Sequence, residues 1–501
     1  MLDRITRRLG YLVAVGVGYL TVNRTIRTLS GGEAQRVALT KALGAGLVNT
    51  LYVLDEPSIG LHERDTHRLI AIVQALRDSR NTVIVVEHDE SFLRSADHLV
   101  DMGPGAGDAG GLIVYQGPLD GLNHAANSAT ADFLMGRRSI SVAEQRRPPD
   151  TGWIRVRGAR GNNLKNIDAD FPLGLLCVVT GVSGSGKSTL VEQTLYAGLC
   201  QRLKHPGPKP VPFDDITFVS PRGDEKTISA DQPGGSGPIG GCVLVDQSPI
   251  GRTSRSNPVT YVKAFDEIRR AFADTSEARM RNYGPGHFSF NVEGGRCTAC
   301  QGQGVQIIDM QFLADISITC PECGGRRFRK EILDAKYRGK SIADVLDMSV
   351  REAIEFFRGR TKILEALAPL KAVGLEYLRL GQPADTLSGG EAQRLKLAGH
   401  LAATTRQATL LILDEPTTGL HAADILHLLD CFNALLSVGH SLIVVEHNLD
   451  VIKCADWIID LGPEAAGDGG RVVACGKPEE IAEAKGSHTG FYLKRVLKNR
   501  G

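Results

Sequence analysis

The sequence has no large excess of either charge. Its 58 Lys and Arg residues almost balance 57 Asp and Glu residues, which gives a net charge of +1. Any surface for nucleic acid must therefore be a local patch. No apolar run is long enough to cross a membrane, and ten cysteines in 501 residues are too few for a disulfide scaffold. The length suits about two to four domains, and the many glycines favour loops that approach ligands closely.

The dominant feature that is present is a long internal repeat. Strings of six or more residues return at an offset of 358 to 359 residues, so the chain holds two copies of one domain and is not a short-period solenoid. The paired strings are LSGGEAQR (29–36 and 387–394), LDEPSIGLH and LDEPTTGLH (54–62 and 413–421), VIVVEH and LIVVEH (83–88 and 442–447), and DMGPGAGDAGG and DLGPEAAGDGG (101–111 and 460–470).

The N-terminal stretch looks at first like a secretion signal. Arg7 and Arg8 precede the apolar run LGYLVAVGVGYL. However, AVGVGYLTV at 14–22 returns inside the chain as AVGLEYLRL at 372–380. An internal copy cannot be a secretion signal, so we expect a cytoplasmic protein that does not bind a membrane.

A glycine-rich loop of the form GxxxxGK[ST] occurs once, as GVSGSGKST at 181–189. It follows the apolar run LCVVT and precedes a helical pattern, the context in which backbone N–H groups wrap phosphates. We expect Lys187 to reach the β- and γ-phosphates of a nucleotide and Ser188 to ligate Mg²⁺. An ordinary glycine turn is the alternative. The predicted contacts are Gly181, Ser183, Gly184, Ser185, Gly186, Lys187, Ser188 and Thr189.

Acidic residues end the next apolar run, LLILDEP. Asp414 is expected to hold Mg²⁺, directly or through water, and Glu415 to act as general base toward the attacking water. A solvated acidic turn is the alternative. His447 follows the run SLIVV and could sense the γ-phosphate. A lone histidine is more often structural, but its repetition at His88 favours a functional role.

The string LSGGEAQR places a serine and two glycines before a helix-forming run. Ser30, Gly31 and Gly32 could offer a hydroxyl and backbone N–H groups to an anion at a helix N-terminus. Serine followed three residues later by glutamate is also the pattern of a helix capping box. Both roles are compatible.

Two CxxC pairs predict a metal site. Cys297, Cys300, Cys320 and Cys323 form CTAC-x₁₉-CPEC, a spacing suited to a tetrahedral structural Zn²⁺. The intervening GVQIIDMQFLADISI suits a hairpin. A redox dithiol or unliganded cysteines are the alternatives, and chaperone zinc modules carry similar spacings, so zinc alone does not establish DNA binding.

Basic residues gather around these cysteines. Residues 279–340 hold ten basic residues against six acidic ones, and RRFRK interleaves charge with an aromatic ring. That pattern is consistent with contacts to a phosphate backbone, whereas a solvated basic face is the alternative. The candidate DNA contacts are Arg279, Arg281, Arg326, Arg327, Arg329 and Lys330.

Together the glycine loop, LSGGEAQR, LDEP and the repeated histidine resemble the ABC-type ATPases. The resemblance implies that ATP is sandwiched between two faces. One face would carry Lys187, Ser188, Thr189, Asp414, Glu415 and His447, and the other Ser30, Gly31 and Gly32. Gln247, in VDQSPIGR, resembles the glutamine that couples the nucleotide to neighbouring modules.

The four-cysteine module lies between the glycine-rich loop at 181–189 and the second LSGGEAQR string at 387–394. This arrangement narrows the resemblance to the UvrA family, the damage-sensing ATPases of bacterial nucleotide excision repair. DQSPIGRTSRSNPVTY and GHFSFNVEGGRC carry it further, over nearly the whole chain. It implies binding of distorted double-stranded DNA through backbone and deformability, ATP-gated handover to a helicase-like, UvrB-like partner, and a homodimer. A drug-resistance ATPase of the same family and a DNA-binding remnant without turnover are the alternatives.

The resemblance and the repeat predict the fold class and its division. We expect an α/β protein with one partial and one complete ABC-type core and an inserted four-cysteine zinc module. The predicted segments are a partial first domain at 1–136, a linker at 137–152, the N-terminal part of the second at 153–250, an insertion and signature region at 251–385, and the second signature, acidic strand end and histidine at 386–501. Residues 204–241, rich in Pro, Gly and Asp, are expected to form a long surface loop.

The sequence departs from the UvrA pattern in its first copy. Family members carry a second phosphate loop, another zinc module and a partner-binding domain in their N-terminal half, and this sequence has none. Asp55, Glu56, His88 and the string 388–390 therefore have no lysine loop to face. We expect a truncated or split form whose first copy exposes part of a parallel sheet near LYVLD.

Overall fold

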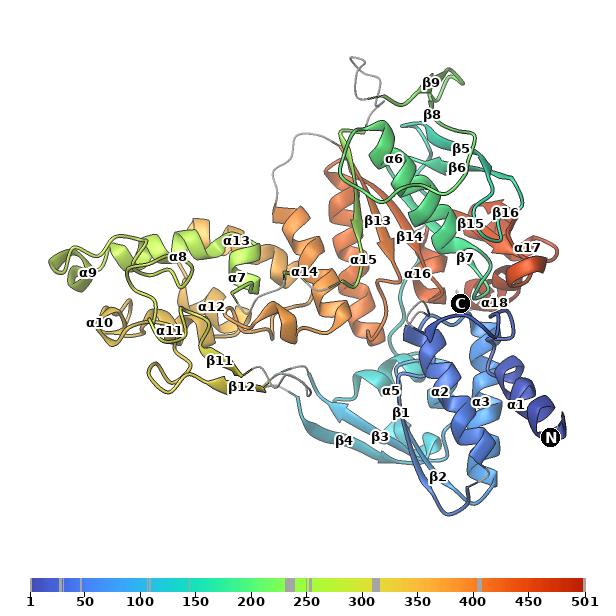
Figure 1. The fold of residues 1–501 in the computed structure, drawn as a ribbon, viewed down its shortest axis with the longest axis horizontal. Helices are drawn as coiled ribbons and strands as arrows, with labels where there is room; N and C mark the ends of the chain where they lie inside the picture. Colours follow the sequence, from blue (N-terminus) through green and yellow to red (C-terminus); the bar gives the residue numbers. More distant parts are fainter. Residues whose placement is uncertain are drawn as a thin grey trace. The chain divides into compact units, whose positions relative to one another are not determined.

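The computed structural model describes residues 2–26, 29, 31–45, 47–105, 107, 110–143, 145–229, 239–248, 250–251, 255–308, 316–402 and 408–498. The chain divides into two compact units (Figure 1). Unit 1 comprises Met1–Pro104, Ala109–Asp246 and Thr405–Gly501, and unit 2 comprises Gly105–Asp108 and Gln247–Thr404. The predicted insertion region at 251–385 lies inside unit 2, while the finer division into five segments stays a prediction.

Unit 1 is built on a six-stranded sheet with the strand order β10-β13-β14-β7-β15-β16. The three apolar runs LLILD, SLIVV and LCVVT form its centre as the parallel strands β13, β14 and β7. Only β16 runs antiparallel to its neighbour. The strands are β7 (Leu176–Gly181), β10 (Gly241–Val245), β13 (Thr409–Asp414), β14 (Ser441–Val445), β15 (Trp457–Gly462) and β16 (Arg471–Gly476).

A smaller antiparallel sheet of the order β6-β5-β8-β9 accompanies it. Its strands are β5 (Trp153–Ala159), β6 (Ile167–Pro172), β8 (Asp215–Val219) and β9 (Glu225–Thr227). The expectation of a long loop over 204–241 is therefore wrong, because β8 pairs with β5 and buries Ile216, Phe218 and Val219. Four of five residues of β8 are buried, and this outweighs the loop-like composition around it.

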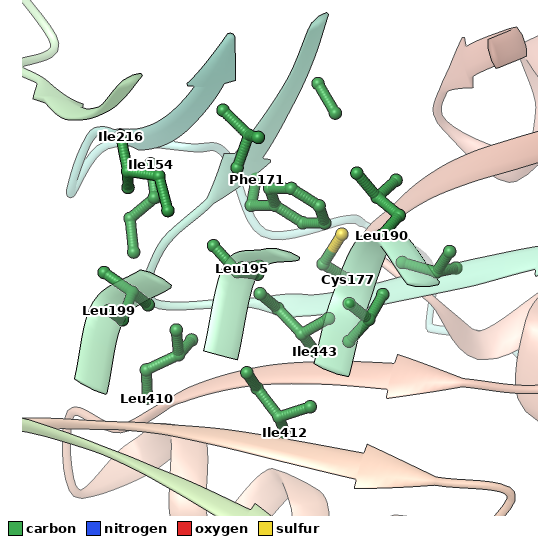
Figure 2. Close-up of a cluster of buried hydrophobic side chains, with 14 of the residues drawn as sticks. Ile154, Phe171, Cys177, Leu190, Leu195, Leu199, Ile216, Leu410, Ile412 and Ile443 are labelled. Atoms are coloured by element: carbon green, nitrogen blue, oxygen red, sulfur yellow. The ribbon is translucent and has the colours of Figure 1, made fainter. Parts of the chain in front are cut away.

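The main core lies between these two sheets. A π-helical segment η4 (Thr189–Tyr196) continues into α6 (Ala197–Arg202). Figure 2 shows Leu195 and Leu199 from these helices packed between Ile154 and Ile216 of the small sheet and Leu410 of the large one. All five side chains are fully buried. The helix that follows the glycine loop is thus fixed by apolar burial on both sides, and this fixes where the loop lies.

The rest of the second copy follows its strands. Its helices are α15 (Ala422–Ser437), α16 (Leu449–Cys454), η6 (Ala466–Asp468), α17 (Pro478–Glu483) and α18 (His488–Lys498). The helix α15 has buried apolar residues spaced along one face, as an amphipathic helix requires.

The first copy forms a smaller body within unit 1. Its helices are α1 (Leu2–Ala14), α2 (Gly31–Ala45), α3 (Glu63–Asp78), α4 (Glu90–Ser95), η3 (Leu119–His124) and α5 (Ala129–Leu134). Its strands are β1 (Leu51–Asp55), β2 (Thr82–Val86), β3 (Leu99–Gly103) and β4 (Leu112–Gly117). β1 pairs with β2 in parallel and β3 with β4 antiparallel, as two separate two-stranded sheets.

One face of the pair β1–β2 is exposed, as the sequence predicts. Leu51, Val53, Ile84 and Val86 are 48 to 64% exposed. Their counterparts in the second copy, Leu410, Ile412, Ile443 and Val445, are at most 1% exposed. The same sequence pattern is therefore covered in one copy and open in the other.

Unit 2 is mainly helical. Its helices are α7 (Pro258–Tyr261), α8 (Ala264–Ala273), α9 (Ser276–Met280), α10 (Lys330–Leu333), α11 (Ile342–Asp347), α12 (Val350–Phe356), α13 (Thr361–Ala372), η5 (Ala384–Thr386) and α14 (Gly389–Ala402). The predicted hairpin is present as β11 (Val305–Ile308) and β12 (Ile316–Thr319), and its turn lies outside the described residues. No helix in the described ranges of either unit is long and apolar enough to cross a membrane.

Candidate nucleotide site and cysteine cluster

The glycine loop joins β7 to η4 at the end of the central strand of unit 1. Gly181, Gly184 and Gly186 have φ values of +134°, +76° and +109°, which side chains other than glycine rarely adopt. Lys187 is 6% exposed, and its Nζ donates hydrogen bonds to the carbonyl oxygens of Gly181 and Val182, both at 3.0 Å. The lysine therefore lies folded over its own loop.

Two features of this loop suit an anion. Burial lowers the pKa of Lys187 to about 8, although the carboxylates of Glu415 and Asp414 oppose that shift. Ser185 is fully buried, and its Oγ has no hydrogen-bond partner in the described part of the chain. Ser188 is exposed, whereas Thr189 is buried and its Oγ1 accepts a hydrogen bond from Asn162. A buried cation and an unsatisfied hydroxyl in a glycine-rich loop that opens a helix fit a phosphate group.

The acidic pair ends β13, beside the loop. Burial and the neighbouring Glu415 carboxylate together raise the pKa of Asp414 to about 7. Burial also raises the pKa of Glu192, on η4, to about 8, and that side chain faces Asp414. Glu415 has a φ of +44°, a left-handed conformation that is strained for glutamate, and Glu56 in the first copy has +43°. Three carboxylates grouped at one strand end offer the oxygen ligands that Mg²⁺ prefers.

His447 completes this group. Its Nε2 lies 3.5 Å from Oε1 of Glu415, and its side chain is 8% exposed. Neither ring nitrogen has a hydrogen-bond partner among the described residues. Burial lowers the pKa of His447 well below the usual value, and the charges of Lys187 and Arg36 lower it further. A buried neutral imidazole with two unpaired nitrogens can donate to, or accept from, a ligand placed beside Glu415.

The first copy contributes to the same site. Ser30 lies outside the described residues, but α2 begins directly after it at Gly31, with Gly32 in its first turn. The hydroxyl of Tyr19 donates to Oε1 of Glu33 on this helix at 2.6 Å. The ring of the same tyrosine lies against Gly184, 3.1 Å from where a Cβ would stand. The start of α2 and the glycine loop are thus joined through Tyr19.

A second segment of the first copy, residues 56–62, also reaches the site. Ser183 Oγ donates to the carbonyl oxygen of Gly60 at 3.1 Å. Arg36 is 3% exposed and acts electrostatically on both Glu415 and His447. Motif reasoning did not single out Arg36, Gly60 or His62, although the repeated string GLH at 60–62 and 419–421 was the available signal.

Gln247 lies in unit 2 and not with the glycine loop's unit. Its Oε1 is 3.2 Å from where a Cβ on Gly389 would stand, at the start of α14. Around this second signature string, Ser388 N donates to Glu391 and Glu391 N donates to Ser388 Oγ, at 2.8 and 3.3 Å. The capping-box interpretation is therefore confirmed at Ser388, and a nucleotide contact by Gln247 stays a prediction.

The four predicted cysteines lie together in unit 2. Their sulfurs all fall within 4.8 Å of one another. The Sγ atoms of Cys297 and Cys320 are 4.0 Å apart, and those of Cys300 and Cys323 are 3.7 Å apart. Four thiolates bound to one Zn²⁺ at about 2.3 Å would stand about 3.8 Å from each other, so the cluster fits such an ion.

The six candidate DNA contacts differ in exposure. Arg279, Arg281, Arg326, Arg329 and Lys330 are exposed, with Arg279 near Asp274 and Arg281 near Asp334. Arg327 is 9% exposed, donates to the carbonyl of Gly381 at 3.0 Å and lies over the ring of Phe290 at 5.3 Å. The guanidinium of Arg327 therefore makes its contacts inside unit 2. Phe328, the aromatic residue of RRFRK, is also buried in the core of this unit.

The α/β core, the buried strands that end in the glycine loop and the acidic pair, and the cysteine insertion define the class: this is the fold of the ABC-type ATPases. A family model described as ABC transporter matches residues 328–418. Trp153, at the start of the second copy, packs edge-to-face on Trp457, with the ring centroids 5.1 Å apart.

Within that class the chain is similar to UvrA. It is 51% identical over 497 residues to UvrABC system protein A of Clostridium perfringens, covering 99% of this chain and 51% of that protein. It is 52% identical over 496 residues to that of Thermus thermophilus, covering 99% and 50%. The crystal structure of UvrA2 from Deinococcus radiodurans matches with a TM-score of 0.89 at 45% identity, covering 99% of this chain and 58% of UvrA2. The chain thus spans about half the length of the curated relatives it matches, and the resemblance inferred from the motifs is confirmed.

Proposed function

We propose that the chain hydrolyses ATP at a composite site shared by its two sequence copies. The observation that carries the proposal is that Lys187, Asp414, Glu415 and His447 lie together beside the glycine loop and act electrostatically on one another. An unpaired histidine, an unpaired serine hydroxyl and crowded carboxylates favour a phosphate with a divalent cation. Residues of the first copy lie against this group and supply the opposite face.

The proposed chemistry assigns one task to each side chain. Lys187 and the amides of the loop 181–189 bind the β- and γ-phosphates, and Gly31 and Gly32 offer their amides from the other side. Asp414 and Ser188 would hold Mg²⁺, which neutralises charge on the phosphate oxygens when bound. Glu415 accepts the proton of the water whose oxygen attacks the γ-phosphorus while the bond to the β-phosphate oxygen breaks.

The histidine would act in its neutral form. Burial holds the pKa of His447 well below its usual value, so the ring keeps a single proton at neutral pH. It can donate that proton in a hydrogen bond to the γ-phosphate while its other nitrogen stays an acceptor. Its distance of 3.5 Å from Glu415 would let it orient the base as well.

We further propose that this ATPase serves DNA-damage recognition in nucleotide excision repair. The similarity to UvrABC system protein A supports the proposal. So does the cluster of four cysteines that flanks the hairpin β11–β12 in the sequence and would hold Zn²⁺. Arg326, Arg329 and Lys330 follow the last cysteine of this cluster and are exposed, so they could contact the phosphate backbone of DNA. Distorted double-stranded DNA, a UvrB-like helicase partner, a homodimer and a cytoplasmic setting belong to this proposal.

The test is an ATPase assay under three conditions. The purified chain is measured alone, with intact duplex and with a duplex carrying a single bulky lesion, and Lys187→Ala serves as the inactive control. Turnover that needs Lys187 and rises with the lesion supports the proposal. Turnover that ignores DNA would favour the drug-resistance alternative. Loss of turnover with retained DNA binding would contradict the ATPase role.

A further inference from the structure

His62 reaches from the first copy into the second. It caps the N-terminus of α3 and is 1% exposed. Its Nδ1 accepts a hydrogen bond from the backbone N–H of Arg64 at 3.2 Å, so the single ring proton lies on Nε2. That Nε2 is 3.1 Å from Oγ1 of Thr489 at the start of α18, to which it donates.

The hydrogen bond continues to a buried carboxylate. Thr489 Oγ1 donates to Oδ1 of Asp460 at 3.1 Å, and Ser487 Oγ donates to Oδ2 at 2.6 Å. Thr489 is fully buried, Asp460 is 2% exposed and Ser487 is 7% exposed. The result is a directed chain of hydrogen bonds from His62 through Thr489 to Asp460. We name these three residues the first latch.

The same arrangement occurs in the reverse direction. His421, which begins α15 of the second copy, accepts at Nδ1 from Ala423 N at 3.1 Å, and its Nε2 lies 3.3 Å from Oγ1 of Thr130. Thr130 Oγ1 donates to Oδ1 of Asp101 at 2.7 Å. His421, Thr130 and Asp101 form the second latch. Each residue stands 359 positions from its counterpart in the other latch. The two copies are therefore joined by two equivalent sets of hydrogen bonds, in each of which one copy supplies the histidine and the other supplies the threonine and aspartate.

The first latch fixes the segment that touches the nucleotide site. Gly60, two residues before His62, accepts the hydrogen bond of Ser183 and lies against the carboxylate of Glu415. The ring of His62 meets the ring of His447 edge-to-face with centroids 6.2 Å apart. Loss of the bond to Thr489 would free His62, and with it the backbone that lines Glu415 and His447.

We propose that His62 is a positioning residue, and that the first latch holds residues 56–62 against Glu415 and His447 so that hydrolysis at Lys187 requires the latch to be closed. The inference rests on the proposed ATPase function. It assigns no contact with ATP to His62, and it predicts an effect on the chemical step more than on nucleotide binding.

The experiment compares matched variants at the two latches. Thr489→Val keeps the shape of the side chain and removes the hydroxyl, Thr489→Ser restores it, and Thr130→Val makes the same change in the second latch. We expect Thr489→Val to lower kcat for ATP by about tenfold with KM within about threefold. Thr489→Ser should return kcat to within about twofold of the parent chain, and Thr130→Val should leave kcat within about twofold.

Other outcomes overturn the proposal. A parental kcat in Thr489→Val, an equal loss in Thr130→Val, or no recovery in Thr489→Ser would each do so. If the parent chain shows no turnover at all, the proposed ATPase function fails, and the latch is then judged by thermal unfolding of His62→Ala, Thr489→Val and their combination. Non-additive shifts in Tm support a direct coupling between the two side chains, and additive shifts refute it.

Discussion

The Cα of Gly60 faces the carboxylate of Glu415, although the two residues belong to different sequence copies. A methyl group on Gly60 would stand 3.0 Å from Oε2 and 3.3 Å from Oε1 of that glutamate. The relationship is reciprocal, because a methyl group on Gly419 would stand 3.3 Å from Oε1 of Glu56. In each copy the glycine after the acidic pair therefore limits where the other copy's glutamate can lie.

Gly60→Ala should impair turnover. Gly60 has a φ of +66°, so alanine would be strained by about 1 kcal/mol and would press on the Glu415 carboxylate. We expect kcat for ATP to fall by about tenfold or more. Gly419→Ala is the matched control, since its φ of +68° brings the same backbone cost beside Glu56, where no glycine-lysine loop stands in this chain. An equal loss of kcat in both variants would contradict the role given to Gly60.

Local patterns sufficed for much of this site. The glycine loop, the acidic strand end and the cysteine spacing are short strings whose geometry follows from their own residues, and the structure places them as the motifs imply. The composite contacts were less accessible, because Tyr19 against Gly184 and His62 against Thr489 depend on how two distant copies pack. The β-strand at 215–219 could not be predicted for a similar reason. Pairing with β5 stabilises it, whereas the residues on either side of it have the Pro-, Gly- and Asp-rich composition of a loop.

Glu415→Gln should separate binding from hydrolysis. The amide keeps the size of the side chain but cannot take a proton from water, a loss that typically costs about 10² to 10⁴ in rate. We expect ATP to bind with unchanged affinity and turnover to fall within that range. Equilibrium binding and single-turnover rates of the same preparations test this. Glu56→Gln is the matched control and should retain turnover, and a slow Glu56→Gln would argue against a single site at Lys187.

The cysteine cluster should bind one zinc ion per chain and stabilise unit 2. Cys320→Ser removes one buried ligand and should lower both metal content and Tm, because a structural zinc site contributes its binding free energy to folding. Cys475→Ser changes an exposed thiol outside the cluster and is the control. Metal analysis and thermal unfolding give the two readings. Full stability of Cys320→Ser without metal would refute a structural role.

Arg326 and Arg327 should behave differently despite being neighbours. Arg326 is exposed, so Arg326→Ala should weaken binding to all duplexes and reduce the slope of log affinity against log salt by about 1. Arg327 packs on Phe290 and bonds to Gly381, so Arg327→Ala should lower the Tm. DNA titrations at several salt concentrations and thermal unfolding distinguish the two. If Arg326→Ala bound DNA with unaltered affinity, Arg326 would not be part of the DNA-binding surface.

His62 should make the fold sensitive to acid. Burial holds its pKa well below 6.5, and the positive groups that face it, His447, Lys187, Arg64 and His488, act in the same direction. The unfolded chain therefore gains a proton below about pH 6.5 that the folded chain does not, and stability present above that pH is lost as the pH falls. The loss per histidine is at most about 1.4 kcal/mol for each pH unit.

Thermal unfolding between pH 5 and pH 8 measures this effect. Because the pKa of His447 is lowered in the same way, His62→Asn should flatten the fall in stability below pH 6.5 without abolishing it. His98→Asn alters an exposed ring and should leave the slope unchanged. If His62→Asn and the parent chain lost stability with the same slope, His62 would have to accept its proton inside the fold. That would be incompatible with the hydrogen bond that its Nδ1 receives from Arg64, since a protonated Nδ1 is a donor.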